Sequence, residues 1–168
     1  MTVIIDTNVI LVANGQHEEV SPGCVTACAL RLQSVMTDGR IALDSGYEML
    51  IEYQKKTQPK TGNRPGEAFV NWALRNNANS KRCDLVTLQP HSKRGYESFP
   101  KDDRLTDFDP PDRKFVAVAA AHDEHPPIVQ ATDSKWVDWA PALQDHGITV
   151  EFVCPKDIQR FHAQKFGK

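Results

Sequence analysis

Three aspartates occupy positions from which their carboxylates can reach one edge of a folded sheet. Asp6 ends the apolar run over residues 2–5, Asp133 ends a second run over residues 127–132, and Asp112 opens a stretch with helical spacing. Carboxylates held close together repel one another and favour their neutral forms unless a cation compensates them. A hard divalent ion with oxygen ligands is the natural companion, so these residues predict a metal site.

Each aspartate taken alone has a plain structural alternative. Asp6 can cap a turn, Asp112 can complement the positive end of a helix, and Asp133 can serve as a helix N-cap. Their joint placement at the edge of one sheet favours the metal site over three separate structural roles.

The pattern of apolar residues predicts the scaffold that positions these acids. Short apolar runs predict strands over residues 2–5, 40–44, 85–88, 127–132 and 148–153, and helical spacing predicts helices that begin near residues 22, 46, 69, 110 and 155. Strands alternating with helices indicate an α/β fold of three layers, with a mostly parallel central sheet and helices on both faces. Residues 89–109 show little periodicity and are predicted to form a long surface loop.

Length and composition favour one globular domain over residues 1–168. The chain is 40% hydrophobic and 25% charged, and its size is that of one domain with a single core. It shows no secretory segment and no apolar run of about 18 residues, so we expect a cytoplasmic protein without a membrane span. The cysteines form no Cys-x-x-Cys motif and are expected to be buried thiols: Cys24, Cys28, Cys83 and Cys154.

Charge is distributed unevenly although the net charge is only −2. Between residues 54 and 104 there are eleven lysines and arginines against five acids. A basic region of this kind binds a polyanion such as RNA, or it is simply a solvated surface. Both interpretations stay open at this point.

Three segments, in this order along nearly the whole chain, resemble the PIN-domain ribonuclease family: residues 3–9 with Asp6-Thr7-Asn8, residues 109–115 with Asp112, and residues 128–133 with Thr132-Asp133. The resemblance implies a ribonuclease that binds Mg²⁺ or Mn²⁺ through four acids and leaves 5′-phosphate and 3′-hydroxyl products. A carboxylate-held divalent ion polarises the phosphoryl oxygen and lowers the pKa of a bound water, so no protein nucleophile is needed.

The second acid of the set is ambiguous in the sequence. Glu48 and Glu52 stand one helical turn apart and can face the same side of a helix. The family's acid follows a strand-end serine by about two helical turns, which fits the distance from Ser45 to Glu52. The resemblance therefore favours Glu52, with Glu48 as the alternative.

Further residues receive roles from the resemblance. Asn8 would shape the turn after the first strand, and Thr132 or Ser134 would hydrogen-bond a metal-bound water or an acidic ligand. Asp138 lies where some relatives carry an additional acid, with a surface helix position as its alternative. The candidate contacts to the RNA backbone are Lys93, Arg94, Arg113 and Lys114.

Rival functions fit the sequence less well. A phosphatase of the haloacid-dehalogenase type needs a second aspartate two residues after Asp6, where this chain has Asn8, and no Gly-x-Gly-x-x-Gly follows the first strand for dinucleotide binding. A catalytically weak PIN fold that binds RNA or protein stays open. The expected partners are RNA and, if the chain is the toxin of a toxin–antitoxin pair, an antitoxin protein; a homodimer and a housekeeping or defence nuclease are also open.

Overall fold

The computed structural model describes residues 1–166 and is built on a parallel five-stranded sheet of order β3-β2-β1-β6-β7. Each neighbouring pair in the sheet is parallel. The strands are β1 (Thr2–Ile5), β2 (Arg40–Asp44), β3 (Cys83–Val86), β6 (Ile128–Gln130) and β7 (Val150–Phe152), and a separate antiparallel hairpin consists of β4 (Pro90–His91) and β5 (Gly95–Tyr96). The predicted α/β class is confirmed.

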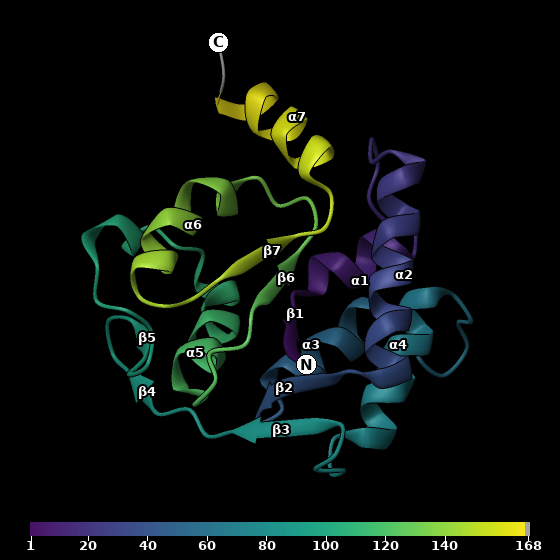
Figure 1. Cartoon of the computed structure of the whole chain (residues 1–168), viewed down its shortest axis with the longest axis horizontal. Helices are drawn as coiled ribbons and strands as arrows, with labels where there is room; N and C mark the ends of the chain where they lie inside the picture. Colours follow the sequence, from purple (N-terminus) through teal and green to yellow (C-terminus); the bar gives the residue numbers. More distant parts are fainter. Residues whose placement is uncertain (167–168) are drawn as a thin grey trace.

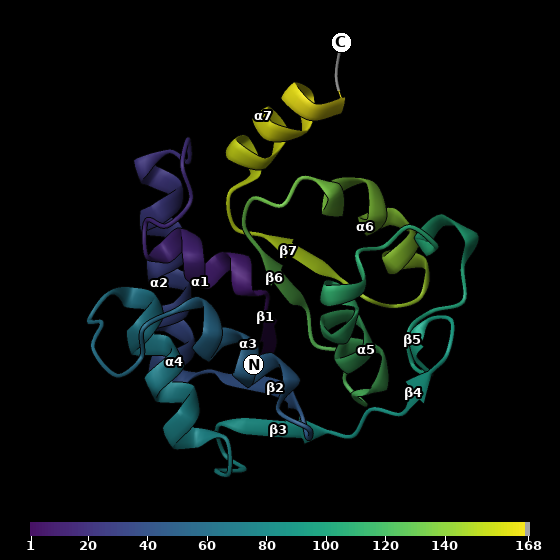
Figure 2. The same cartoon turned by 180° about the vertical axis from the view of Figure 1, so that it is seen from behind.

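Helices cover both faces of this sheet. They are α1 (Thr7–Ala13), α2 (Pro22–Asp38), α3 (Glu48–Lys56), α4 (Pro65–Asn76), α5 (Arg113–Ala121), α6 (Lys135–Asp145) and α7 (Pro155–Phe166), with short 3₁₀ turns η1 (Asp103–Leu105) and η2 (Pro110–Asp112). Figures 1 and 2 show α5 and α6 on one side of the sheet and α1, α2 and α4 on the other. The arrangement is therefore the three-layer α/β/α fold. None of the helices in residues 1–166 has the length and apolar character needed to cross a bilayer.

The central strand β1 is buried along its whole length, as expected for a parallel strand covered on both faces. Its side chains belong to one cluster of buried residues that continues through α2, α4 and α5. The bulkiest fully buried side chains include Trp136, Tyr53, Phe69 and Phe115. The tyrosine hydroxyl donates to the carbonyl of Ile5 at the end of β1, so α3 is fixed to the point where the central strand stops.

The cysteines differ from the prediction. Cys24, near the start of α2, and Cys154, just before α7, form a disulfide, so the expectation of free thiols is wrong for both. The two residues are 130 positions apart in sequence, and the fold brings their Cα atoms to 5.4 Å. Beside the disulfide, Ser21 just before α2 donates hydrogen bonds to Asp157 in the first turn of α7. Cys28 and Cys83 are buried free thiols, as predicted. Because disulfides persist mainly in oxidising compartments, the cytoplasmic location stays a prediction.

Residues 89–109 are more ordered than the predicted surface loop. The segment contains the β4–β5 hairpin and η1, and it buries Phe99, Leu105 and Phe108. The Phe108 ring lies 5.0 Å from the ring of Trp136 and 4.2 Å from that of Trp139 in α6. These apolar anchors lack a strand or helix period, which is why the sequence pattern did not reveal them.

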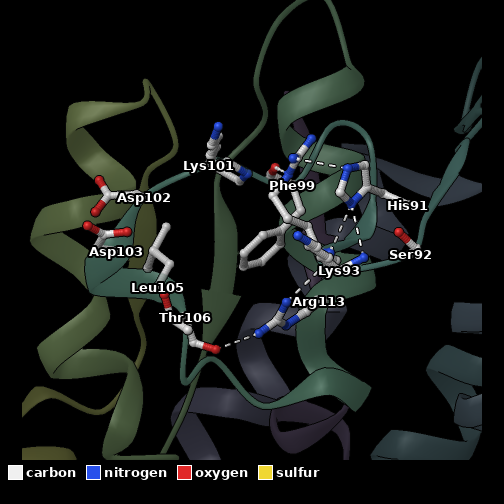
Figure 3. Close-up of a pocket in the computed structure, with 12 residues that line it drawn as sticks. His91, Ser92, Lys93, Phe99, Lys101, Asp102, Asp103, Leu105, Thr106 and Arg113 are labelled. Carbon is white, nitrogen blue, oxygen red and sulfur yellow. Dashed lines mark hydrogen bonds between the residues drawn. The ribbon is translucent and has the colours of Figure 1, made fainter.

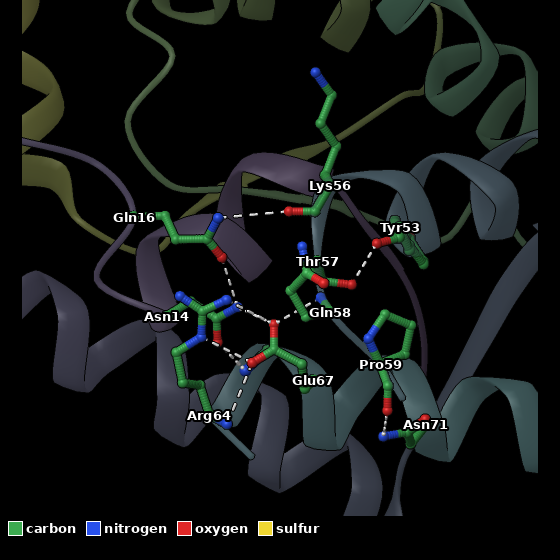
Figure 4. A network of polar contacts seen from close by, with 11 residues as sticks. Asn14, Gln16, Tyr53, Lys56, Thr57, Gln58, Pro59, Arg64, Glu67 and Asn71 are labelled. Carbon is green, nitrogen blue, oxygen red and sulfur yellow. Dashed lines mark hydrogen bonds and ion pairs between the residues drawn. The ribbon is translucent and has the colours of Figure 1, made fainter. Parts of the chain in front are cut away.

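A buried carboxylate fixes α1, α3 and α4 to one another (Figure 4). Glu67 in α4 has no exposed surface, and it accepts hydrogen bonds from the Arg64 guanidinium at 2.8 and 3.0 Å, from the Asn14 amide at 2.9 Å and from the Gln58 backbone at 3.2 Å. The hydrogen bond with Arg64 lowers the pKa of Glu67. A fully paired buried carboxylate of this kind specifies one arrangement of the segments that it joins.

Candidate metal centre

The acids predicted from the sequence lie where the strand order reverses. The chain adds β2 and β3 on one side of β1 and then returns to place β6 and β7 on its other side. In open parallel sheets, ligands bind outside the carboxyl ends of the two strands that flank this switch point. Asp6 follows β1 directly and Asp133 lies three residues beyond the end of β6, so both stand at this position.

Asp6 is the most deeply buried of these acids, with 4% of its surface exposed. Its Oδ1 accepts a hydrogen bond from the Asn8 backbone at 2.8 Å, which caps α1. Its Oδ2 is buried and has no hydrogen-bond partner among residues 1–166. Burial, followed by repulsion from Asp112 and from Asp133 and Glu52, raises the pKa of Asp6 well above its ordinary value. An unpaired buried carboxylate oxygen is costly unless a cation or proton satisfies it.

Three further aspartates form a compact cluster beside Asp6. Asp109, Asp112 and Asp133 each offer a carboxylate oxygen, and these oxygens lie within 4.8 Å of one another. Asp109 and Asp112 flank the two prolines of η2. Residues three apart eclipse one another in a 3₁₀ turn, so this turn directs both carboxylates to the same side.

The electrostatic state of the cluster reflects this crowding. Burial, then repulsion from Asp133 and Glu52, raises the pKa of Asp112 to about 6. Burial also raises the pKa of Asp133, and Asp109 adds repulsion, although a backbone hydrogen bond from Lys135 opposes the shift. Burial is the larger cause of both shifts and repulsion between carboxylates adds to it, so both groups favour their neutral forms when no cation is near.

The structure separates the two candidate glutamates. Glu52 in α3 accepts hydrogen bonds from the Thr7 hydroxyl and, at 2.9 Å, from the Lys114 ammonium group, and it adds to the repulsion felt by Asp6. Glu48 is exposed and accepts a hydrogen bond from the Tyr96 hydroxyl at 2.8 Å. Glu52 is therefore the glutamate that lies with the aspartates.

Two lysines partly neutralise the cluster. Lys114 is 7% exposed and donates to Glu52 and to the carbonyl of Pro111. Lys135 lies 3.1 Å from a carboxylate oxygen of Asp109, and this hydrogen bond raises the pKa of Lys135. Five carboxylates against two ammonium groups leave an excess of three negative charges when all are ionised.

Residues at the strand ends hold the cluster in shape. The Oδ1 of Asn8 accepts hydrogen bonds from the backbone and hydroxyl of Thr132 at 2.7 and 3.1 Å, which joins α1 to the segment after β6. Asn8 thus lies in a helix rather than in the predicted turn. Ser134 is buried and is the N-cap residue of α6. Asp138 lies on α6 outside the acidic cluster, exposed and 2.9 Å from His162.

The four basic residues predicted to contact RNA have different surroundings. Lys93 is exposed, whereas Arg94 and Arg113 use their guanidinium groups to bind backbone carbonyls of residues 94–108. Lys114 faces the acidic cluster instead of the outer surface. Contact with RNA stays a prediction for all four.

Two surface hollows flank the acids and leave room for a substrate. One, of about 520 Å³, is lined by Asn8, Thr132, Asp133 and Ser134 together with residues of α7. The other, of about 510 Å³, is lined by Glu52, Lys114 and neighbouring residues of α3 and η2. Asp133 is therefore accessible from the first hollow and Glu52 from the second.

Sequence reasoning missed three members of the site: Asp109, Lys135 and the hydroxyl of Thr7. A signal for Asp109 was present, because two consecutive prolines between two aspartates favour a tight turn that aligns their side chains. Lys135 and Thr7 carry no comparable signal, since their contacts depend on how distant elements pack.

The residues present fit a hard divalent cation. The cluster offers only carboxylate oxygens, the ligands that Mg²⁺ and Mn²⁺ prefer, and the unpartnered Oδ2 of Asp6 lies beside repelling carboxylates.

Comparison of the chain with models of known families, with curated proteins and with solved structures finds no match.

Proposed function

We propose that this chain is a metal-dependent ribonuclease of the PIN-domain type, which hydrolyses RNA phosphodiesters at the acidic cluster. The observation that supports the proposal most strongly is Asp6, a buried carboxylate with one unpartnered oxygen at the switch point of the sheet. Asp112, Asp133 and Glu52 lie close enough to repel it, and Asp109 clusters with Asp112 and Asp133. Such a cluster has the charge and the oxygen ligands to hold Mg²⁺ or Mn²⁺.

Asp6, Asp112, Asp133 and Glu52 would hold the metal, with Asp109 beside them. A bound divalent ion would polarise the phosphate and supply a hydroxide nucleophile near neutral pH. The chain's own residues orient the ligands: Thr7 fixes one oxygen of Glu52, and Asn8 fixes the backbone of Thr132 next to Asp133.

The two lysines have a role in binding the substrate. The ammonium groups of Lys114 and Lys135 lie among the carboxylates, where they can also donate hydrogen bonds to phosphate oxygens. They would reduce the repulsion between an anionic strand and the acids before any reaction occurs.

The test is cleavage of a fluorophore–quencher single-stranded RNA by the purified full chain. We expect cleavage with Mn²⁺ or Mg²⁺ and none in excess EDTA. Asp133→Asn should abolish it, whereas Asp138→Asn, which removes the same charge from an exposed position, should not. Cleavage that persists in EDTA contradicts the metal mechanism, and equal cleavage of the corresponding DNA would show a nuclease without preference for RNA.

A second candidate function is RNA or protein binding without cleavage. It is favoured by the ion pairs of Lys114 with Glu52 and of Lys135 with Asp109, which already neutralise two of the five acids. Calorimetric binding of Mn²⁺ and binding of RNA, together with no cleavage, would support this alternative.

Whether the chain acts as a toxin with an antitoxin partner is a separate proposal, tested by co-purification of a small protein with the native chain.

A further inference from the structure

A second concave site lies in the ordered segment 89–109 and includes Arg113 at the start of α5, but none of the acids of the cluster. It has a volume of about 450 Å³, which is within the range of small-molecule and nucleotide sites. Phe99 and Leu105 contribute its apolar part, and the β4–β5 hairpin contributes one wall. Figure 3 shows Arg113 reaching toward Thr106 and the His91 ring facing Lys93.

Positive charge dominates this pocket. Lys93, Arg94, Lys101 and Arg113 all line it, and none of these four has a carboxylate within 4.0 Å in the described part of the chain.

Two acids also line the pocket, but one of them is already neutralised. Asp102 is bound to Arg104 at 2.7 Å and lies 3.0 Å from His146. Asp103 is the remaining acid, so the pocket keeps a positive excess.

The two arginines are held in place without losing their charge. Arg113 donates to the carbonyls of Phe108, Arg94 and Thr106 at 2.9–3.2 Å, and its guanidinium lies 4.8 Å from the centre of the Phe99 ring. Arg94 donates to the carbonyls of Phe99 and Glu97 at 2.9 and 3.1 Å. Carbonyl dipoles orient a guanidinium but do not cancel its charge, so the pocket presents fixed cations to an anion.

The chain connects this pocket directly to the acids. Asp112, Arg113 and Lys114 are consecutive: Asp112 and Lys114 face the acidic cluster, and Arg113 lines the basic pocket. Asp109, at the end of the same segment 89–109, belongs to the acidic cluster. A strand that crosses the start of α5 would therefore meet both sites.

We propose that the basic pocket lined by Lys93, Arg94, Lys101 and Arg113 holds a backbone phosphate of the RNA strand, next to the phosphodiester that lies at the acids. The identification of the bound strand as RNA rests on the proposed function. Guanidinium and ammonium groups without carboxylate partners recognise phosphate and carry no information about base identity. The pocket thus sets how the strand lies across the acids and binds all sequences alike.

The test measures binding apart from cleavage. A fluorescein-labelled single-stranded oligoribonucleotide is titrated with the full chain in EDTA, and anisotropy gives the dissociation constant at several salt concentrations. The variant is Lys93→Ala with Lys101→Ala, since both side chains are exposed and their loss leaves the packing intact. The matched control is Lys81→Ala with Lys156→Ala, which removes the same charge at exposed positions outside the pocket.

Each phosphate contact to a single strand contributes about 0.7 to the slope of log affinity against log salt. We expect the pocket variant to weaken binding and reduce the magnitude of this slope by about 0.7 to 1.4, and the control variant to leave the slope unchanged. An equal loss of RNA affinity and of salt slope in the pocket and control variants would show only general electrostatic attraction to the surface and would overturn the proposal. A parallel titration with adenosine monophosphate tests whether the pocket binds a free nucleotide instead of a strand. If the mononucleotide binds as tightly as the oligonucleotide, and this binding is lost in the pocket variant, the pocket is a nucleotide site and the proposal is overturned.

Measuring binding and cleavage separately distinguishes failure of the phosphate site from failure of the proposed ribonuclease function. If the chain cleaves RNA but the pocket variant has an unchanged salt slope of RNA affinity, the phosphate site is wrong and the proposed nuclease activity is unaffected. If the salt slope is reduced but the chain cleaves no RNA, the phosphate site is supported and the proposed enzymatic activity is wrong.

Discussion

Replacing Asp112 by asparagine keeps the shape of the side chain and removes one negative charge from the acidic cluster. The pKa of Asp112 is raised from 3.8 to about 6 in the folded protein, so the native state holds this proton more tightly than the unfolded chain does. Between about pH 4 and pH 6 the native state therefore binds more protons, and its stability falls as the pH rises through this window. Above about pH 6 the full cost of the ionised carboxylate is present.

The size of this cost follows from the shift. About two pKa units correspond to roughly 3 kcal/mol of destabilisation in the metal-free protein. Asparagine also gives up a favourable interaction with the start of α5, worth about 0.3–1 kcal/mol. The net gain expected for Asp112→Asn is about 2 kcal/mol at pH 8, or roughly 4–8 °C in Tm for a chain of this length. The gain should vanish near pH 4, where the wild-type carboxyl is protonated.

The assay is thermal unfolding followed by circular dichroism in EDTA, at pH 8 and near pH 4, for wild type, Asp112→Asn and Asp138→Asn. The exposed control should change stability by less than about 0.5 kcal/mol. In parallel, Asp112→Asn should weaken Mn²⁺ binding and abolish RNA cleavage. An asparagine variant that is less stable than wild type at pH 8, or that cuts RNA at the wild-type rate, would refute the reasoning.

Further predictions concern the glutamates, one lysine and the metal. Glu52→Gln should sharply reduce Mn²⁺ affinity measured by calorimetry, whereas Glu48→Gln should leave it unchanged; the reverse result would make Glu48 the ligand. Lys114→Met should destabilise the metal-free protein in urea unfolding by about 3–5 kcal/mol, because it leaves Glu52 without its buried partner, and a change below about 1 kcal/mol would show that the pair is solvated. Mn²⁺ at about 100 times its dissociation constant should stabilise the wild type by roughly 2.7 kcal/mol in the same assay, and no shift would indicate that the cluster holds no metal.

Much of this architecture is predictable from local patterns in the sequence. The apolar run before Asp6 and the alternation of strands and helices predict the parallel sheet, and the switch-point rule then places Asp6 and Asp133 together. The strand predicted at residues 85–88 is shifted to Cys83–Val86, and Asn8, predicted to shape a turn, lies in a helix over Thr7–Ala13 that was not predicted. Boundaries and short helices depend on packing partners that a local pattern does not contain.

The parts that could not be predicted are contacts between residues far apart in sequence. The pair of Glu52 with Lys114 spans 62 positions, and the disulfide spans 130. Charge and helical spacing alone do not separate Glu48 from Glu52; the family resemblance favours Glu52, and its contacts with Thr7 and Lys114 place it with the aspartates. A charge pattern can therefore predict which residue types form the site without predicting which of two neighbours belongs to it.

The disulfide between Cys24 and Cys154 divides the chain into a covalent ring, an N-terminal arm before Cys24 and a C-terminal arm that begins with α7. The ring carries β2, β3, β6 and β7, together with Glu52, Asp109, Asp112 and Asp133. The N-terminal arm carries β1 and Asp6. Because β2 and β6 pair only through β1, the closed ring by itself holds two separate half-sheets, with the acids divided between them. The N-terminal arm therefore supplies both the central strand that joins the two halves and Asp6, the most deeply buried acid of the site.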